Sequence, residues 1–523
     1  MTLTPAAAFG LVAAAAGGVA GFGLLPAVRD NPAFQWSFFV PGGALLAWGV
    51  VLFATAHRHG RAFALQISLR RQHYVQACAQ LVVFAYWGWH WRPVYDAAFL
   101  IAAQLVFAYA FAMLLSWSRG NSCTLGFGPV PVIFSINLFL WFRDEWFYLQ
   151  FVLVALGFLA KEFIRWNKNG RRVHIFNPSS FPLAVFSLGL ILTGTSDLTW
   201  GQDIAVSQFY PPHIYFVLFL VALPGQYLFG VASMTMPAVA ASYLFGLLYF
   251  ASTGVYFFYD SYIPIAVFLG MHLLFTDPST APRTELGRVC FGVLYGLGTA
   301  ALYVLLGRAG VPTFYDKLLL VPVLNLSIQL LDRAARSRWL GGFDRAILAR
   351  WREPRRRNLA WMAAWAGLFL VMSATQGVGD RHPGQWAPFW QQACAEGRPY
   401  ACPYLADMQS GFCRGGSAWA CNEAGVLHVA LARSGDDARR RDPLDAAEPF
   451  RRGCELGFEP ACGNVAELIA GRGAFRRAPP GLDDFPIILR GTKGPIANLS
   501  PAYLYARACS QGWEDACGRA GIE

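Results

Sequence analysis

The sequence predicts an all-α protein, in which a polytopic bundle of transmembrane helices precedes a C-terminal α/α-repeat domain that contains disulfides. The chain of 523 residues is 55% hydrophobic and only 14% charged, whereas about a quarter of the residues in a soluble protein are charged. Many of its apolar stretches are also long enough to cross a bilayer. Four cysteine pairs with one common spacing predict the repeat domain.

Thirteen apolar segments approach the roughly 20 residues that a helix needs to cross the hydrocarbon core of a membrane. They lie near residues 6–27, 37–56, 75–91, 97–117, 128–142, 146–164, 179–195, 213–231, 236–253, 261–276, 288–307, 316–331 and 358–376. The segments that begin at 128 and 236 are the weakest candidates for a membrane span. No basic residue precedes the first segment, so we expect an uncleaved span there and not a signal peptide.

Basic residues predict the orientation of the bundle. The chain before Gly377 carries a net charge of +12 and the remainder carries −1. The excess lies in alternate loops, and the loop 332–357 contains nine arginines: Arg333, Arg336, Arg338, Arg345, Arg350, Arg352, Arg355, Arg356 and Arg357. Because cytoplasmic loops are rich in Lys and Arg, we expect a multi-pass membrane protein with its N-terminus inside. After an odd number of spans the C-terminal domain is then on the outside, and the arginine run is a membrane-surface loop with no nucleic-acid partner.

Eight cysteines in the C-terminal region share the frame C-x-x-G-x-x-x-A-C. The expected disulfide pairs are Cys394 with Cys402, Cys413 with Cys421, Cys454 with Cys462, and Cys509 with Cys517. On one continuous helix the two cysteines of a frame would lie about 12 Å apart, but a disulfide needs Cα atoms within roughly 7 Å. If each pair bonds, the helix ends between its cysteines, and the shared glycine is the residue type that ends helices in the left-handed conformation. We therefore expect helical hairpins with disulfide-linked elbows in an oxidising compartment.

A metal site is the weaker interpretation of the cysteines, because no C-x-x-C spacing occurs and zinc ligands lie closer together. Amphipathic stretches precede several frames, which makes the region an internal repeat. The frames resemble the cysteine-rich Sel1-like repeats of secreted bacterial proteins. The resemblance implies stacked helix pairs whose concave face binds a protein partner. The first cysteines of successive frames lie 19, 41 and 55 residues apart, so we expect an insertion that includes the Gly/Pro-rich residues 472–501.

Two polar clusters in the expected cytoplasmic loops, residues 160–181 and 275–298, are the candidates for chemistry. Each contains a step to proline, at Asn177 and at Asp277, followed by small hydroxyl residues. Backbone N–H groups at a helix N-terminus, with Ser, Thr and Arg nearby, suit a phosphate or another anion. The alternative is purely structural: both residues cap helical turns, with proline at the first helical position.

The second cluster, continued to Asp332, resembles the signature of the NqrB/RnfD family. These are membrane subunits of the sodium-pumping NADH:quinone reductase and of Rnf electron-transport complexes. The resemblance is carried by Gly270, Thr276, Asp277, Pro278, Thr280, Ala281, Thr284, Gly287, Arg288, Phe291, Gly292, Gly296, Asn325 and Asp332. In the first cluster it is carried by Ala160, Lys161, Glu162, Gly170, Phe176, Asn177 and Pro178.

The resemblance implies a subunit that holds flavin in the membrane and passes electrons between partner subunits. In the family, FMN is linked to the Thr of an S-x-A-T motif in an external loop, but neither 196–213 nor 251–263 contains that motif. We therefore expect FMN or another flavin to be bound noncovalently. The residues expected to line its site are Asn177, Pro178, Thr276, Asp277, Thr280, Thr284, Gly287 and Arg288.

The sequence divides into four expected parts. They are an N-terminal transmembrane extension (1–145), an NqrB/RnfD-like core (146–335), the Arg-rich loop with the last span (336–376) and the external Sel1-like domain (377–523). The expected function is that of a membrane subunit in a flavin-linked oxidoreductase complex, related to NADH:quinone reductases or Rnf complexes, with a repeat domain for partner docking. The alternative is a non-redox membrane scaffold or transporter that kept the fold without flavin.

Overall fold

The structure, a computed structural model, describes residues 2–59, 61–168, 170–343, 353–434, 443–489 and 499–521. Arg345, Arg350 and Arg352 of the arginine run lie outside the described residues. The chain forms two compact units, which we call the bundle unit (1–242 and 265–371) and the repeat unit (243–264 and 372–523).

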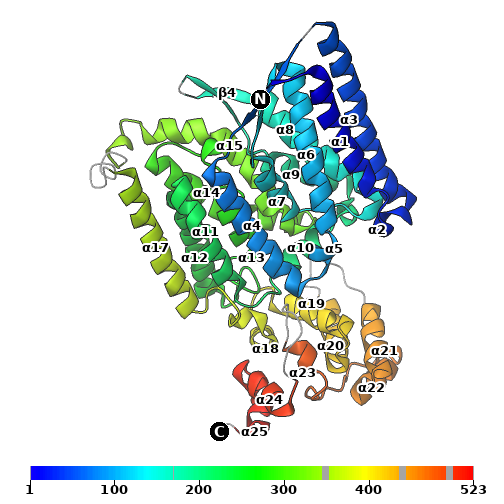
Figure 1. Cartoon of the computed structure of the whole chain (residues 1–523). Coiled ribbons are helices and arrows are strands. Elements are labelled where there is room, and N and C mark those ends of the chain that lie inside the picture. Colours follow the sequence, from blue (N-terminus) through cyan, green and yellow to red (C-terminus); the bar gives the residue numbers. More distant parts are fainter. Residues whose placement is uncertain are drawn as a thin grey trace. The chain divides into compact units, whose positions relative to one another are not determined.

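Helices make up most of the bundle unit (Figure 1). Those before residue 200 are α1 (Pro5–Phe22), α2 (Pro26–Arg29), α3 (Pro32–Arg58), α4 (Arg71–His90), α5 (Pro93–Asp96), α6 (Ala98–Arg119), α7 (Pro129–Asn137), α8 (Tyr148–Phe163) and α9 (Ser180–Thr193). The later ones are α10 (Gly201–Ser207), α11 (Ile214–Phe229), α12 (Ala232–Thr253), α13 (Ile265–Leu273), α14 (Glu285–Arg308), α15 (Asp316–Ala335) and α17 (Pro354–Ala374). Helices α12 and α17 both continue into the repeat unit.

Each of the thirteen expected segments contains a helix. Among the described residues, six helical segments are long and apolar enough to cross a membrane: Pro5–Phe22, Pro32–Arg58, Pro93–Arg119, Ala232–Thr253, Glu285–Arg308 and Thr313–Ala335. Helices α9 and α11 are apolar but shorter. The segment expected from residue 236 is a full helix of 22 residues, whereas the one expected from 128 is a helix of only nine residues.

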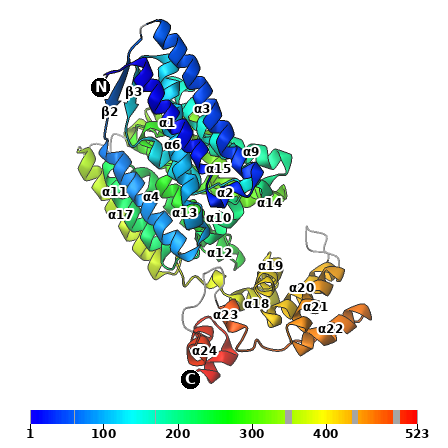
Figure 2. The same ribbon diagram turned by 45° about the vertical axis from the view of Figure 1, so that its right-hand side comes forward.

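Ten helices of the bundle unit form two series of five in chain order, α4, α6, α7, α8, α9 and α11, α12, α13, α14, α15. In both series the third helix has nine residues and the others have 14 or more. The first helices of the two series, α4 and α11, pack against each other, and so do the last, α9 and α15 (Figure 2). This shared order and pairing are the marks of an internal structural repeat.

The two nine-residue helices, α7 and α13, end close together inside the unit. A helix of nine residues rises about 13.5 Å, which is less than half of a bilayer core. Every residue of α13 is buried, and the Ser135 hydroxyl of α7 donates to the carbonyl oxygen of Leu273, the last residue of α13, at 3.5 Å. Both helices are therefore short interior segments that meet at their C-terminal ends.

Buried amide side chains make hydrogen bonds with backbone groups of the non-helical segment that follows α7, or lie beside it. The Gln150 side chain donates to the Leu140 carbonyl and accepts from the Phe142 N–H, both at 3.3 Å. The Asn137 amide at the end of α7 donates at 2.8 Å to Gln104, and both side chains are almost fully buried. Because buried backbone groups need hydrogen-bond partners, the Gln150 amide supports the break in the helix, and Asn137 and Gln104 bond to each other beside it.

Short strands accompany the helices, which the all-α expectation did not include. Strands β1 (Thr2–Leu3), β2 (Phe63–Ile67) and β3 (Ser122–Leu125) form one sheet, in which β2 pairs antiparallel with β1 and parallel with β3. Strands β4 (Arg165–Lys168) and β5 (Arg171–His174) form an antiparallel hairpin in the first polar cluster. This hairpin leads the chain from α8 into Asn177.

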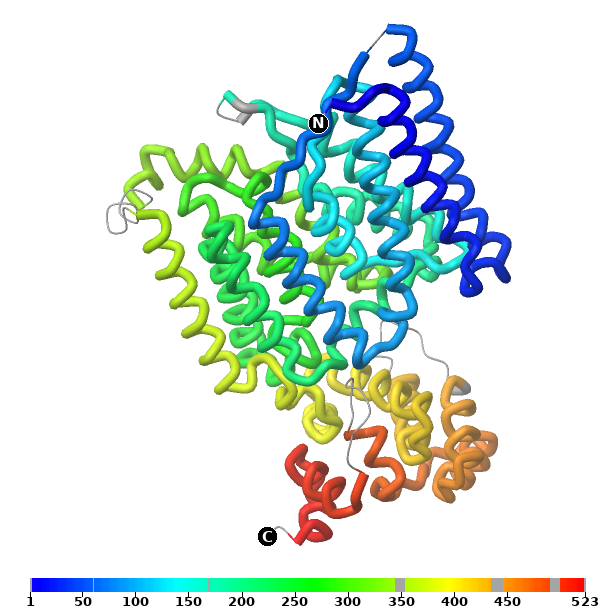
Figure 3. Tube along the Cα trace, in the orientation of Figure 1, coloured from blue at the N-terminus to red at the C-terminus, as the bar shows by residue number. Residues whose placement is uncertain are grey.

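The repeat unit is a series of short helices, drawn in yellow to red in Figure 3. They are α18 (Ala387–Ala395), α19 (Ala401–Arg414), α20 (Ala418–Ser434), α21 (Ala447–Glu455), α22 (Glu459–Ile469), α23 (Phe485–Ile488), α24 (Pro501–Ser510) and α25 (Glu514–Arg519). Its buried core includes Phe412, Trp419, Phe485, Ile488 and Leu504.

All four expected disulfides are present, and each closes an elbow between two consecutive helices. The bonded pairs are Cys394 with Cys402, Cys413 with Cys421, Cys454 with Cys462, and Cys509 with Cys517. Their Cα–Cα distances are 4.5 to 4.6 Å, so the helix does end between the cysteines as predicted. The shared glycine has a positive φ in every elbow, at Gly397, Gly416, Gly457 and Gly512. The first two elbows share α19, which explains the separation of only 19 residues between their first cysteines.

The predicted insertion, residues 472–501, contributes to the core of the repeat unit. Helix α23 inside it buries Phe485 and Ile488. The preceding Asp484 accepts hydrogen bonds from the Ser417 hydroxyl at 2.6 Å and from the Trp419 N–H at 3.2 Å, which caps the start of α20. The described first part of the insertion, residues 472–489, is therefore packed into the core of the repeat unit.

Residues Tyr243–Pro264, which contain an expected loop between two spans, also belong to the repeat unit. The Tyr259 ring stacks on Tyr404 of α19 at 3.8 Å between centroids. The Gln385 side chain donates to the Asp260 carbonyl at 2.9 Å. An aromatic loop from the middle of the sequence is therefore part of the packing of the repeat unit.

Candidate functional site

Asn177 is the centre of the first polar cluster. Its side-chain oxygen accepts from the N–H groups of Ser179 and Ser180, at 2.9 and 3.2 Å, at the start of α9. Its amide nitrogen donates at 3.0 Å to the carbonyl oxygen of Leu274, just past α13. The capping interpretation of Asn177 is confirmed, and the same side chain also ties the first cluster to the second.

Asn325 of α15 joins the two clusters from a third place in the sequence. Its side-chain oxygen accepts from the Asn177 N–H at 3.2 Å, and its amide nitrogen donates to the Thr280 carbonyl at 3.1 Å. Asn325 is fully buried. A buried amide that bonds two loop backbones fixes their separation, because losing either partner would leave a polar group unsatisfied.

Asp277 caps a 3-10 turn, Pro278–Thr280, in the second cluster. Its carboxylate accepts from the Ser279 N–H at 2.9 Å and from the Ser279 hydroxyl at 2.6 Å. His174 of β5 lies 3.7 Å from the other carboxylate oxygen. Burial alone would raise the pKa of Asp277, but the nearby His174 ring and the hydrogen bonds from Ser279 together hold the pKa below its ordinary value. Asp277 is therefore a carboxylate that is already satisfied by its own loop.

Thr284, and not Asp277, caps the long helix α14. Its hydroxyl oxygen accepts from the Gly287 N–H at 3.2 Å and donates to Asp332 of α15 at 2.8 Å. The same Asp332 carboxylate accepts from the N–H groups of Arg283 and Thr284, each at 2.9 Å. Three donors on one buried carboxylate fix the start of α14 to the end of α15.

The remaining predicted residues have local structural partners. The Thr276 hydroxyl donates to the His272 carbonyl at 2.8 Å. The Arg288 guanidinium donates to the Pro282 and Gly230 carbonyls, each at 3.0 Å. The carbonyl of Pro178 lies against Gly157 of α8. Arg288 therefore holds the loop before α12 to the start of α14.

The structure thus brings the three separate motif segments, near residues 177, 280 and 330, into one connected cluster. Each polar side chain predicted to line a flavin site makes at least one hydrogen bond within the chain: Asn177, Thr276, Asp277, Thr280, Thr284 and Arg288. These side chains bond to neighbouring groups of the chain and do not by themselves form a cradle for a flavin phosphate. Arg172 and Arg283, which belong to the two polar clusters, are exposed.

Sequence reasoning did not single out the polar residues around the broken helix α7. Gln80, Gln104, Asn137 and Gln150 are all almost fully buried in the bundle unit. A signal was available for Gln104, Asn137 and Gln150, because each is the only amide in its apolar segment. In this chain these three amides lie at or beside the non-helical backbone that follows α7.

No family model, curated protein or solved structure matches this chain. The resemblance to the NqrB/RnfD family and to Sel1-like repeats therefore stays a prediction from the motifs.

Proposed function

We propose that the chain is a multi-pass protein of the bacterial inner membrane with thirteen membrane segments, its N-terminus inside and its repeat domain in the periplasm. Six long apolar helices and the helices within the seven other apolar segments support this proposal. The four disulfides support an oxidising location for the repeat domain. The nine-residue helices α7 and α13 each supply half of a membrane segment, and non-helical chain completes it.

Within this arrangement, the bundle is a membrane subunit of an electron-transport complex, and the repeat domain docks a partner. The observation that carries the proposal is the Asn177–Asn325–Thr280 connection. If motif segments belong to one site, they should lie close together in the folded chain. The segments near residues 177, 280 and 325 do so. The proposal includes partner subunits that supply and accept electrons, as the resemblance to the NqrB/RnfD family implies.

The proposed cofactor is FMN or another flavin, held noncovalently. When bound, a flavin would supply the one- and two-electron redox chemistry. The eight predicted residues would act as the frame of the site, and the exposed Arg172 and Arg283 would approach a phosphate. Asn325 and Asp332 keep the loops that carry these arginines in place.

A non-redox membrane scaffold or transporter is the second candidate. The two interior helices α7 and α13 favour it, because transporters commonly build their binding sites from discontinuous helices near the centre of the membrane. The saturated hydrogen bonding of the motif residues also fits a purely structural role for the cluster.

A spectrum of the detergent-purified protein, before and after acid precipitation, separates the two candidates. Flavin absorption that passes into the acid supernatant is the expected result for a noncovalent redox subunit. A flavin retained in the pellet would contradict the noncovalent site. If neither fraction contains flavin and added FMN does not restore it, the electron-transport proposal fails and the scaffold or transporter takes its place.

A further inference from the structure

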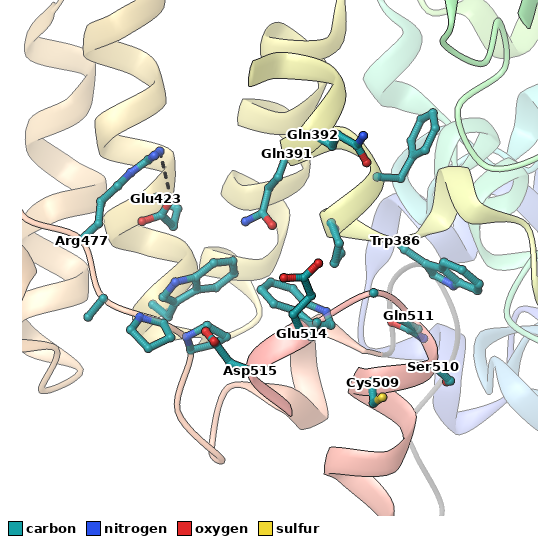
Figure 4. A pocket seen from close by; sticks show the side chains of 18 residues that line it. Trp386, Gln391, Gln392, Glu423, Arg477, Cys509, Ser510, Gln511, Glu514 and Asp515 are labelled. Atoms are coloured by element: carbon teal, nitrogen blue, oxygen red, sulfur yellow. Dashed lines mark ion pairs between the residues drawn. The ribbon is translucent and has the colours of Figure 1, made fainter. Parts of the chain in front are cut away.

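The repeat unit contains a pocket of about 980 Å³ between α18, α20, the segment 478–480 and the fourth elbow (Figure 4). Aromatic side chains line much of it: Trp386, Phe389, Trp419 and Trp513. The rings of Trp419 and Trp513 meet edge to face at 5.3 Å, which joins α20 to the fourth elbow. The volume is at the upper end of the range for small-ligand sites, so it can hold several residues of a peptide.

Charges in the lining are mainly negative. Three carboxylates, Glu423, Glu514 and Asp515, face one cation, Arg477. Glu514 and Asp515 are exposed, and in Figure 4 the side chains of Glu514 and Gln391 point toward one another across the pocket. Aromatic faces combined with carboxylates favour a cationic ligand, because the cation gains both ion pairing and cation–π contact.

The Glu423–Arg477 pair shows that the pocket already accommodates a guanidinium. Arg477 lies 3.0 Å from one oxygen of Glu423, and its side chain is 53% exposed while that of Glu423 is only 8% exposed. The other oxygen of Glu423 is buried and has no hydrogen-bond partner among the described residues. Burial raises the pKa of Glu423 despite the opposing charge of Arg477. A buried carboxylate with one unused oxygen can accept a further donor.

We propose that this pocket binds an arginine side chain carried by an extended segment of a partner protein. The inference rests on the docking role in the proposed function and names the chemistry of the partner. The aromatic rings would contact the aliphatic stem and the charged end, and Glu514 and Asp515 would pair with the cation at the mouth. Arg477 is the internal competitor for Glu423, since it occupies the same carboxylate from the chain's own insertion.

Binding of the full-length detergent-purified protein to an array of hexapeptides tests the proposal. Each peptide carries one central arginine with varied flanking residues, and a duplicate array carries citrulline, the neutral isostere, at that position. The expected result is a subset of arginine peptides that bind and whose citrulline copies do not. A double variant, Glu514→Gln with Asp515→Asn, should weaken that subset roughly tenfold. Arg477→Ala should strengthen it, because removal of the competitor frees Glu423.

Glu459→Gln is the matched control. Glu459 occupies the same place in the third elbow as Glu514 in the fourth, and each is the first residue of its helix, α22 or α25. The control should bind like the unmodified protein. Equal binding of arginine and citrulline peptides, no bound arginine peptide, or equal losses in the control and pocket variants would each overturn the proposal. Flavin content is measured on the same samples, so a colourless protein that binds peptides would refute the redox function and leave the docking site standing.

Discussion

The backbone N–H of Asn177 donates to the side chain of Asn325 across 148 positions of sequence, at 3.2 Å. The Asn325 side chain uses its other end to hold the Thr280 carbonyl at 3.1 Å. One buried amide therefore connects the start of α9, the turn after α13 and the middle of α15. Three segments that resemble one family signature converge on this residue.

Replacement of Asn325 should be costly. We expect Asn325→Ala to lower the stability of the detergent-solubilised protein by about 2–4 kcal/mol, since it removes two hydrogen bonds and leaves the Thr280 carbonyl and the Asn177 N–H unsatisfied. Thermal unfolding followed by tryptophan fluorescence measures the loss. The control is Thr193→Ala, which removes an exposed hydroxyl that bonds to the nearby Gly189 carbonyl and Thr195 hydroxyl. This variant should leave the midpoint of thermal unfolding nearly unchanged. An equal midpoint for both variants would refute the bridging role of Asn325.

Close packing of α12 on α14 should make Gly292 intolerant of any side chain. A Cβ atom at Gly292 would collide with the Met234 carbonyl oxygen of α12, so we expect Gly292→Ala to destabilise the protein by about 1–3 kcal/mol. A Cβ atom at Gly189 of α9 meets nothing within 4 Å. Because alanine favours helix over glycine, Gly189→Ala should leave stability equal or slightly higher. A loss of the same size at both positions would contradict the packing of α12 on α14.

The disulfide of the fourth elbow, between Cys509 and Cys517, should stabilise the lining of the pocket. We expect the double variant Cys509→Ser with Cys517→Ser to cost about 2–3 kcal/mol, the value for a closed loop of this length. Limited proteolysis of the full chain, with fragments identified by mass, should then cut within residues 499–521 before other parts of the repeat unit. Unchanged protection of that region in the double variant would show that the elbow does not depend on its disulfide.

His382 should make the repeat unit less stable in mild acid. The side chain is fully buried, and burial lowers its pKa to about 3 from an ordinary value of 6.5. The unfolded chain takes up this proton below about pH 6.5 and the folded chain does not. Stability that is fully present above pH 6.5 is therefore lost toward pH 3, at up to about 1.4 kcal/mol per pH unit.

Asn at position 382 offers a control that does not titrate. The Nδ1 atom of His382 accepts the Gly384 N–H at 3.1 Å, and an asparagine oxygen can accept the same bond. As the pH falls from about 7 to about 5, the unfolding midpoint of the native chain should fall more than that of His382→Asn. A difference that does not change with pH would contradict the burial of a neutral imidazole.

Much of the helical arrangement follows from local signals in the sequence. Apolar length located the thirteen helix-bearing segments, and the glycine within each cysteine frame located the elbows, because both effects act over a few residues. The ends of α7 and α13 had no such signal, because the apolar run continues beyond both helices. The end of α7 is held by buried amides such as Gln104 and Gln150, and the backbone just past α13 is held by Asn177. These partners come from other parts of the chain.

Long-range partners explain what sequence reasoning missed at the site and in the repeat unit. Capping by Asn177 and Asp277 could be predicted from neighbours in the chain, but the bond from Asn325 could not, since its partners are far away in sequence. Likewise, Tyr259 belongs to the repeat unit because it stacks on Tyr404, and nothing near Tyr259 indicates that pairing.

The orientation of the chain is the central claim, and a count of free thiols in intact bacteria tests it most directly. Cells that produce the full chain are quenched in acid, denatured without reductant, and treated with a polyethylene glycol maleimide that adds a fixed mass to each thiol. The chain has 11 cysteines. A periplasmic repeat domain predicts three additions, on Cys78, Cys123 and Cys290, and eleven only after reduction. Eleven additions without reductant would place the cysteine frames in a reducing compartment and contradict the proposed topology.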